Sequence, residues 1–214
     1  MEHINNNGFK YVDLKLPSGT LWATCNIGAN KPSDFGQYFQ WGDTVGYTKD
    51  QIGFGKGHKV FAIDWSDYKW YENGTMHNPT FSKYTTADAT LDLEDDAAYI
   101  NMGGDWHIPT PEQIRELIIE TTNTFVRRLI GTNGRLFTSK KDTSKSIFIP
   151  DASCVCNGFI FNSQCYSDGN GNIWSSMLSA DDVKDGQRLF FSAHYVGLGN
   201  YKRYYGLPVR GVIG

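Results

Sequence analysis

Alternating apolar and polar residues near the start of the chain predict its first two strands. Residues 11–16 (Tyr-Val-Asp-Leu-Lys-Leu) alternate, residues 17–19 (Pro-Ser-Gly) interrupt the pattern, and residues 20–25 resume it. Side chains along a strand point to opposite faces in turn, so this alternation indicates two half-buried strands joined by a turn. We expect residues 1–10, before the first strand, to form a flexible N-terminal segment.

A repeat with helical spacing follows in the middle of the chain. From Ile114 onward, apolar residues recur at i, i+3 and i+4, which places them on one face of a helix. Thr110 and Gln113 have the spacing of a capping box, in which each side chain accepts a hydrogen bond from the other residue's backbone N–H. A proline also occupies the first helical position, where its missing N–H costs nothing. We therefore predict a helix over residues 111–120.

Several shorter segments have the composition of strands and turns. Asn133-Gly134 is a typical hairpin turn and lies between strands predicted over residues 124–130 and 135–139. The last two predicted strands, residues 188–192 and 207–212, flank a polar and aromatic loop over residues 193–205. The other predicted strands cover residues 146–149, 159–161 and 173–176.

Residues 43–90 show neither helical nor strand periodicity. A loop of this length in a compact domain is either functional or packed down by its own side chains, and its aromatic content favours an ordered, packed loop. Residues 91–100 then predict a short helix with acidic residues in its first turn, where the helix dipole favours negative charge. Calcium binding is the alternative for these acids. The ligand spacing of an EF-hand loop is missing, so helix capping is favoured.

The composition is that of a globular protein rich in turns and aromatic residues. The 214 residues include 23 glycines, 13 Phe, 12 Tyr and 6 Trp. With 23 acidic and 20 basic residues, the net charge of -3 gives no attraction to nucleic acid. No apolar run approaches the roughly 18 residues of a membrane-spanning helix, so we expect no membrane insertion.

Cysteine and histidine residues give little support for a catalytic or metal site. Cys154 and Cys156 would share one face of a strand, but no second cysteine pair and no paired histidines complete a four-ligand site. We interpret both as buried small hydrophobic residues, and His107, beside Trp106, as a packed residue rather than a ligand or base. A G-x-S-x-G motif is also missing from the sequence. We therefore expect no catalytic residue, no metal and no cofactor.

Motifs spread over nearly the whole chain occur in an order found in a known family. The longest covers residues 11–29 (YVDLKLPSGTLWATCNIGA). The others are residues 35–42, 94–98, 106–110, 146–150, 174–176 and 203–210. In combination they resemble the Fibrobacter-type major paralogous domain. One departure is Val209-Arg210-Gly211-Val212, where the family usually has Val-Arg-Pro-Val.

That family is similar to the formylglycine-generating-enzyme branch of the C-type lectin fold. The resemblance implies an α+β domain with a small twisted antiparallel sheet, two helices and extensive ordered loops, here a single C-type lectin-like domain over residues 11–214. The branch includes oxidases and also variable proteins diversified by retroelements. An oxidase of the formylglycine-generating type needs a pair of reactive cysteines near its C-terminal end. The last cysteine here is Cys165, which disfavours that function.

Residues 193–205 occupy the position of the variable segment in the diversified proteins. Their tyrosines offer contact area and their small polar residues offer adaptable hydrogen bonds, as in a binding surface; an ordinary turn loop is the alternative. We expect residues 193–201 of this loop and residues 177–180 to form one exposed face that binds a partner, while Arg203 and Arg210 hold the scaffold. The predicted ligand-binding residues are Met177, Leu178, Ser179, Ser192, His194, Tyr195, Gly197, Leu198, Asn200 and Tyr201.

The sequence therefore favours a binding module whose partner is a protein or a glycan on a cell surface. A structural domain of a surface appendage or virion is the alternative. Residues 1–7 are polar and lack the apolar core of a signal peptide. The protein thus stays inside the cell, leaves it by another route, or is part of a longer chain. The resemblance favours a bacterial or phage surface, and the sequence leaves the oligomeric state open.

Overall fold

The computed structural model describes residues 3–4, 7–129, 131–160 and 169–214, which form an α+β protein with several small antiparallel sheets. The helical elements are the 3-10 helices η1 (Lys49–Gln51) and η2 (Leu93–Asp95) and the α-helices α1 (Ala97–Met102) and α2 (Pro111–Glu120). The strands are β1 (His3–Ile4), β2 (Lys10–Asp13), β3 (Leu21–Ala23), β4 (Tyr38–Phe39), β5 (Tyr71–Gly74), β6 (Pro79–Phe81), β7 (Thr121–Leu129), β8 (Thr132–Ser139), β9 (Ser146–Pro150), β10 (Val155–Cys156), β11 (Phe159–Ile160), β12 (Gly171–Leu178), β13 (Asp185–Phe191), β14 (Val196–Lys202), β15 (Leu207–Pro208) and β16 (Val212–Ile213).

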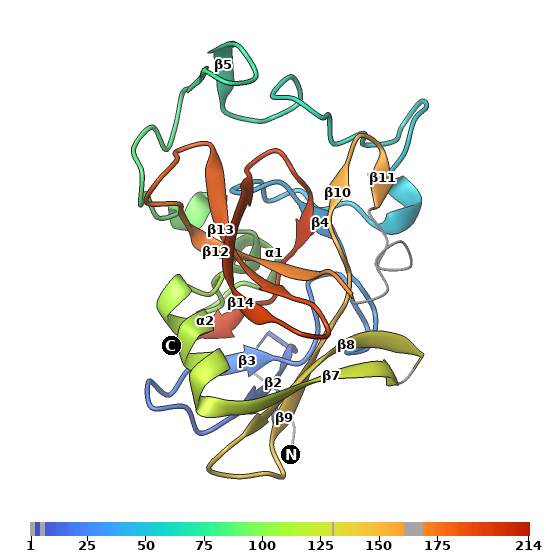
Figure 1. Cartoon of the computed structure of the whole chain (residues 1–214), viewed down its shortest axis with the longest axis vertical. Helices are drawn as coiled ribbons and strands as arrows, with labels where there is room; N and C mark the ends of the chain where they lie inside the picture. Colours follow the sequence, from blue (N-terminus) through green and yellow to red (C-terminus); the bar gives the residue numbers. More distant parts are fainter. Residues whose placement is uncertain (1–2, 5–6, 130, 161–168) are drawn as a thin grey trace.

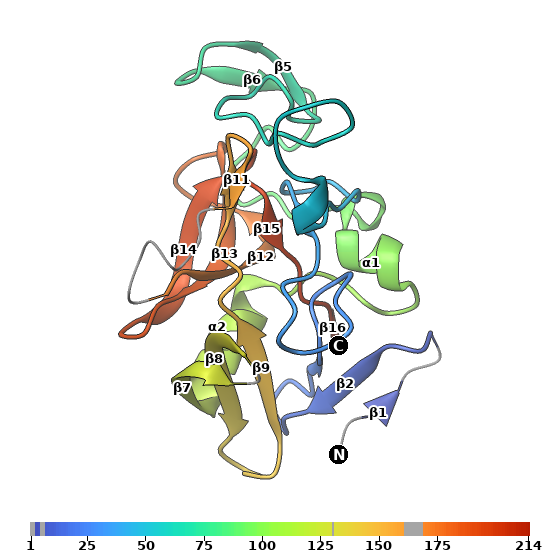
Figure 2. The ribbon, with the colours of Figure 1, turned by 90° about the vertical axis from the view of Figure 1, so that its right-hand side faces the viewer.

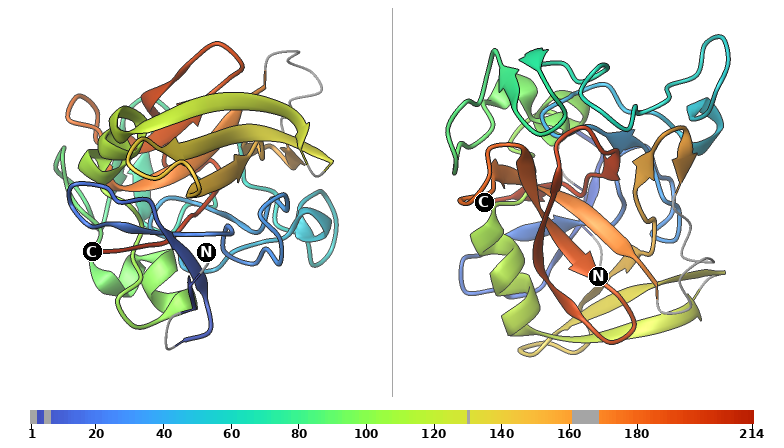
Figure 3. Two further views of the ribbon diagram at one scale, coloured as in Figure 1. Left: turned by 90° about the horizontal axis from the view of Figure 1, so that it is seen from below. Right: turned by 45° about the horizontal axis from the view of Figure 1, so that its top comes forward.

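Three of the sheets follow one another along the long axis of the molecule. The β5–β6 hairpin is at the top of Figure 1, the β7-β8-β9 sheet is near the bottom, and the β12-β13-β14 sheet lies between them. Figure 2 shows the four-stranded β1-β2-β3-β16 sheet at the lower end, beside the β7-β8-β9 sheet. Helix α2 runs alongside β12 and β14 (Figure 3). The single small sheet expected from the sequence is thus replaced by several.

The four-stranded sheet joins the two ends of the chain. Strand β16 pairs with β3, so that Val212 lies opposite Trp22. Strands β2 and β3 confirm the two strands predicted from the opening alternation. Residues 1–10 were expected to be flexible, but among those described β1 pairs with β2, and the Asn7 side chain donates a hydrogen bond to the carbonyl of Met102.

The helix predicted over residues 111–120 is confirmed as α2. The Thr110 N–H donates to Gln113 Oε1 at 2.9 Å and the Gln113 N–H donates to Thr110 Oγ1 at 3.2 Å, which completes the predicted capping box. The helix buries Ile114 and Leu117 against the central sheet. The helix predicted over residues 91–100 is instead divided into η2 and α1, because Asp96 begins a new helix as the N-cap of α1.

Large aromatic residues, four tryptophans among them, fill the core. Trp22, Trp41, Trp106 and Trp174 are all almost completely buried. Trp22 lies in a lower cluster with residues of α2 and the central sheet, and the other three lie in an upper cluster with α1. Burial of such large apolar side chains provides much of the stability of a chain with so little regular secondary structure.

The long segment over residues 43–90 is ordered and packed by its own aromatic side chains, as predicted. Trp65, Tyr68 and Trp70 form a buried cluster with Phe81 of β6. Arg203 is buried against this cluster, and its guanidinium lies 3.8 Å from the ring centre of Phe81. A cation over an aromatic face is attracted by the ring quadrupole, so this contact fixes the segment to the C-terminal part of the chain.

Arg210 lies between two short strands where the sequence predicted one strand over residues 207–212. Strand β15 pairs with β4 and strand β16 pairs with β3, while Arg210 is fully buried between them. Its guanidinium donates to Asn26 Oδ1 at 2.8 Å and to the carbonyls of Ala23 and Phe148 at 2.9 and 3.1 Å. The prediction that Arg203 and Arg210 hold the scaffold is confirmed by these contacts.

The β7–β8 hairpin forms, but its turn is not at the predicted Asn133-Gly134. Leu129 pairs with Thr132, and Gly131 has a φ of 89°, in the left-handed region that favours glycine. Gly134 lies inside β8, where an added Cβ would collide with the Phe148 ring and the Ile149 carbonyl. That glycine is therefore required for close strand packing and not for the turn. The predicted strand over residues 159–161 is confirmed as β11 up to Ile160; residue 161 lies outside the described residues.

Residues 196–202, predicted as part of a loop, form strand β14 and pair along their whole length with β13. Val196 and Leu198 pack against the lower core, and Gly197 and Gly199 take the alternate positions. Glycine is depleted in strands and has no side chain, so the alternation of apolar and polar residues that indicates a strand is not visible in this part of the sequence. Strands β13 and β14 are thus a hairpin.

Candidate functional site

The candidate site lies on the β13–β14 hairpin, which includes most of the predicted ligand-binding residues. We call the face of the hairpin that carries Arg188, Phe190, Gly197 and Gly199 its outer face. Directly opposite residues in an antiparallel pair point to the same face. The pairs Arg188–Gly199 and Phe190–Gly197 therefore lie on one face, while Leu189 and Leu198 lie on the opposite face, toward the core. Part of this outer face packs on the upper core, because buried Trp174 of β12 pairs with Arg188 and a Cβ at Gly186 would meet Trp41 and Trp174.

The turn of the hairpin folds an aromatic ring onto this outer face. The Ser192 N–H donates to the Tyr195 carbonyl at 2.8 Å, which closes the turn. The Tyr195 ring centre lies 5.9 Å from that of Phe190, yet 52% of Tyr195 is exposed. A Cβ added at Gly197 would collide with the Tyr195 hydroxyl. The ring thus lies over the glycine and keeps a large accessible surface for contact with a partner.

Arg188 also lies on this face, where it is 8% exposed, and it was not among the predicted site residues. Its guanidinium lies 4.7 Å from the ring centre of Phe190 and 4.2 Å from that of Tyr201, and Nη1 donates to Asn172 Oδ1. Burial lowers the Arg188 pKa to about 10, because the charged form is desolvated. Only the cross-strand register, which the sequence does not show, reveals that this arginine faces Gly199.

The predicted ligand-binding residues divide between the two faces of the hairpin. His194, Tyr195, Gly197 and Tyr201 lie at the turn or on the outer face, with His194 exposed and Tyr201 half-buried. Leu198 packs against the core. Residues Ser192, Gly197 and Leu198 are each half-buried. The expectation of one continuous exposed face from residues 193–201 is therefore wrong, because strand pairing sends alternate side chains to opposite faces.

The second predicted segment, residues 177–180, is mostly inaccessible. Leu178 is 0% exposed and Ser179 is 1% exposed, so the expectation that they contact a ligand is wrong. Met177 is half-buried and forms a bridge with Thr90. The two segments do meet, because the exposed Asn200 donates from Nδ2 to Ser179 Oγ at 3.0 Å. This contact belongs to the core side of the sheet, away from Arg188.

The cysteines of the described part of the chain are free, and two are buried next to the tyrosines of this region. The Cys154 thiol lies 3.6 Å from the Tyr201 hydroxyl. Burial raises the pKa of Cys154 and raises that of Cys156 to about 11, so both thiols stay protonated at neutral pH. This agrees with the interpretation of both as small buried residues. Cys165, the last cysteine, lies outside the described residues.

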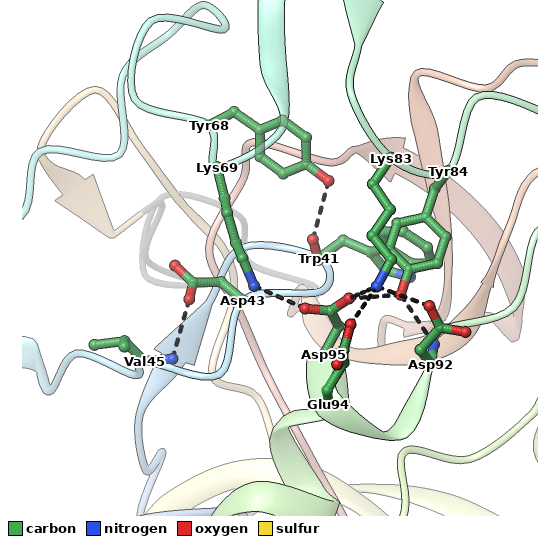
Figure 4. Close-up of polar contacts among 10 residues, drawn as sticks. All are labelled: Trp41, Asp43, Val45, Tyr68, Lys69, Lys83, Tyr84, Asp92, Glu94 and Asp95. Carbon is green, nitrogen blue, oxygen red and sulfur yellow. Dashed lines mark hydrogen bonds and ion pairs between the residues drawn. The ribbon is translucent and has the colours of Figure 1, made fainter.

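The acidic residues after β6 surround a lysine (Figure 4). Lys83 Nζ lies 2.7 Å from Asp92, 2.9 Å from Glu94 and 2.5 Å from Asp95. Lys69 also contacts Asp95, at 2.8 Å. Carboxylate oxygens of the three acids lie within 4.8 Å of one another, close enough to share a metal ion. The Lys83 ammonium group already contacts all three carboxylates, so a divalent cation would have to displace it.

The remaining acid of this segment has the capping role that the sequence favoured over calcium binding. Asp96 Oδ1 accepts hydrogen bonds from the N–H groups of Ala98 and Tyr99, and Oδ2 accepts one from Ile108. His107 is also a packed residue, as predicted: its ring nitrogens lie 3.0 Å from the Ile108 carbonyl and 3.2 Å from the Gly214 carbonyl. Asp96 therefore links α1 to Ile108, and His107 links the same segment to the C-terminal residue.

Comparison of the chain with protein-family models, with curated proteins and with solved structures finds no match. The arrangement of residues on the hairpin is therefore the basis for assigning a function. In the part of the chain that the structure describes, no helix is long and apolar enough to cross a membrane.

Proposed function

We propose that this protein is a ligand-recognition module, with the outer face of the β13–β14 hairpin as its binding surface. The proposed partner is a protein or glycan on a cell surface, and the proposed scaffold is C-type lectin-like. The observation that carries the proposal is the exposed Tyr195 ring, which lies over Gly197 and next to Phe190. Tyrosine combines large contact area with few rotatable bonds, which suits it to recognition.

The way the hairpin is attached supports a binding role. Leu189 and Phe191, on the core face of β13, are fully buried. Arg135 donates from Nη2 to the carbonyl of Ser192 at 2.7 Å, at the base of the turn. A rigid attachment of this kind lowers the entropy lost when a partner is bound. The α+β scaffold and the tryptophan core are also compatible with the C-type lectin resemblance of the sequence.

The chemistry of the hairpin favours binding over catalysis. The thiols of Cys154 and Cys156 are buried and have raised pKa values, which makes them poor nucleophiles. The His107 ring contacts the backbone carbonyls of Ile108 and Gly214, neither of which belongs to the hairpin. The proposal therefore assigns no catalytic residue and no cofactor to this face.

The proposal can be tested with labelled protein and intact bacterial cells or a glycan array. In the test variant His194 and Tyr195 are both replaced by Ala, which removes exposed side chains of the turn and leaves the core side of the hairpin unchanged. The control is Phe54→Ala, because Phe54 is an aromatic residue with 61% exposure outside the hairpin. We expect the double variant to lose binding and keep its melting temperature, while the control keeps both. Equal binding by all three proteins would refute the proposal, and unfolding of the double variant would show that the turn is structural.

A further inference from the structure

Strand β14 is an edge of the β12-β13-β14 sheet and pairs with β13 alone; Figure 2 shows it as the outermost strand of this sheet. The bond from the Ser192 N–H to the Tyr195 carbonyl sets the hydrogen-bonding phase of the hairpin. Because hydrogen-bonded and non-hydrogen-bonded pairs alternate in an antiparallel ladder, Val196, Leu198 and Asn200 point their backbone N–H and C=O groups away from β13. Among the described residues, none of these backbone groups has a hydrogen-bond partner.

The other edge of the same sheet, strand β12, is covered by a different part of the chain. The Leu91 N–H donates to the Ser176 carbonyl at 2.9 Å, and the Leu178 N–H donates to the Ala89 carbonyl at 2.9 Å. In β7, an edge strand of the β7-β8-β9 sheet, the pairing with β8 is interrupted after Val126 by an irregularity. Covering segments and bulges of this kind prevent one sheet from pairing with another along their edges.

Strand β14 has neither form of protection in the described part of the chain. Its 7 residues pair with β13 in an unbroken register, include no proline, and are all half-buried or exposed. Its one charged residue, Lys202, lies at the end of the strand and is paired with Asp185 at 2.6 Å. A regular edge with so little charge presents a template for a further strand.

We propose that β14 pairs in antiparallel orientation with β14 of a second copy of this chain, so that Leu198 lies opposite the same residue of the second copy. In this register Val196 of each copy lies opposite Asn200 of the other, and the backbone groups that point away from β13 bond to one another. Gly197 lies opposite Gly199, so no side chains collide between the two strands on the outer face. This inference goes beyond the proposed function and does not depend on it.

The side chains of β14 favour a second copy over an unrelated peptide. A peptide that adds to a sheet edge is selected by pockets for its alternate side chains. Gly197 and Gly199 supply no side chains to form the walls of such pockets. On the core face Leu198 is half-buried, and an apolar residue directly opposite it would cover the part that is still exposed. A two-fold axis brings another Leu198 to that position, which makes the edge complementary to itself.

The pairing would also place two hairpins side by side. The two-fold axis between antiparallel strands is perpendicular to their sheet, so the two three-stranded sheets would continue into each other with both outer faces on the same side. The exposed Tyr195 rings of both copies would then face the same way. If the proposed function is correct, two such rings could engage one cell surface together and raise the apparent affinity.

The test measures self-association of the full chain by sedimentation velocity over a range of concentrations. Asn200→Pro removes one N–H from the free edge, at a position where proline is compatible with an edge strand. Asn200→Ala is the matched control, because it also loses the side-chain bond to Ser179 but keeps the N–H. Amide hydrogen exchange of the unaltered protein, followed by NMR at low and high concentration, gives a second measurement that needs no variant.

We expect a reversible dimer with a Kd of roughly 1–100 µM, because an interface formed mainly by one strand edge is small. Asn200→Pro should weaken the dimer at least about tenfold, since each copy loses one N–H···O bond and leaves a carbonyl unpaired. Asn200→Ala should dimerise like the unaltered protein. The amides of Val196, Leu198 and Asn200 should exchange freely at low concentration and become protected at high concentration, whereas that of Gly199 should be protected at both.

A chain that stays monomeric at about 1 mM would overturn the inference and leave the edge free for the strand of another protein. A dimer that is equally stable in Asn200→Pro would overturn it as well, because the contact would then lie elsewhere. Protection of the Val196, Leu198 and Asn200 amides in the monomer would show that the edge is already covered, which also refutes the inference. If Asn200→Pro unfolds, the concentration dependence of exchange in the unaltered protein decides. The cell-binding experiment tests the proposed function separately.

Discussion

Replacing each of the four buried tryptophans by phenylalanine would test how hydrogen bonding contributes to this core. Trp41 and Trp174 donate from Nε1 to the carbonyls of Ser175 and Phe39, at 2.9 and 2.7 Å. Trp22 and Trp106 are equally buried, but their Nε1 atoms have no hydrogen-bond partner among the described residues. The same chemical change should therefore have two different costs.

The expected difference follows from the contacts of each indole. Every Trp→Phe change removes ring atoms and weakens packing, at roughly 0.8 kcal/mol for each buried carbon that is lost. At positions 41 and 174 it also removes a hydrogen bond and leaves a buried carbonyl unpaired, which costs about 1–3 kcal/mol more. At positions 22 and 106 it removes a buried unpaired N–H, which offsets part of the packing loss by a similar amount. We expect Trp41→Phe and Trp174→Phe to be at least about 2 kcal/mol more destabilising than Trp22→Phe and Trp106→Phe.

Urea unfolding, followed by circular dichroism, measures these differences directly if the slopes of the transitions are equal. Trp106→Ala serves as a reference for full loss of the ring and should cost about 3–5 kcal/mol. If Trp106→Phe were as destabilising as Trp41→Phe, the indole N–H of Trp106 would have to be hydrogen-bonded in solution, and the distinction between the two pairs of tryptophans would be wrong.

Three further substitutions test other parts of the scaffold. Gly134→Ala should destabilise the protein by about 1–3 kcal/mol in urea unfolding, since its Cβ collides with the Ile149 carbonyl, whereas Gly131→Asn at the turn should be better tolerated because asparagine adopts positive φ. Burial alone would raise the pKa of Asp95, but hydrogen bonds from Lys69, Lys83 and Tyr84 hold it below its ordinary value. Its contribution to stability is therefore present above the unfolded pKa of about 3.9 and is lost as the pH falls through the lower, folded pKa. Lys83→Met should accordingly lower the melting temperature at pH 7, and this decrease should become smaller as the pH is lowered below about 3.9; a decrease that is equal at all pH values would contradict this assignment.

The elements that could be predicted from the sequence are those determined by nearby residues. The capping box of Thr110 and Gln113 lies within four residues, and it formed as predicted. The alternation in residues 11–25 gave strands β2 and β3. The burial of large aromatic residues such as Trp106 follows from their size and polarity alone, wherever the chain places them.

The errors concern features that depend on pairing between distant residues. Gly134 has the sequence of a turn, but its neighbours on β9 require it inside a strand. Gly197 and Gly199 weakened the strand pattern of β14, which forms because β13 pairs with it over its whole length. Leu178 and Ser179 were predicted to be exposed, but they lie at the end of β12, where the core covers them. Tertiary contacts override local propensity at each of these positions.

The same pairing explains how the proposed surface can differ in sequence without loss of the fold. In β14, Val196 and Leu198 face the core, whereas Gly197, Gly199 and Tyr201 face outward. Tyr201 also packs against the upper core, so of these outward positions Gly197, next to the exposed Tyr195, is the one where effects on stability and on binding should be most nearly separable. Arg188 sets a limit to this freedom, because its buried guanidinium lies against the rings of Phe190 and Tyr201 and directly over Gly199. A large side chain at Gly199 would have to displace this guanidinium, so Gly199→Leu should lower the melting temperature, whereas a change at the exposed Tyr195 should not.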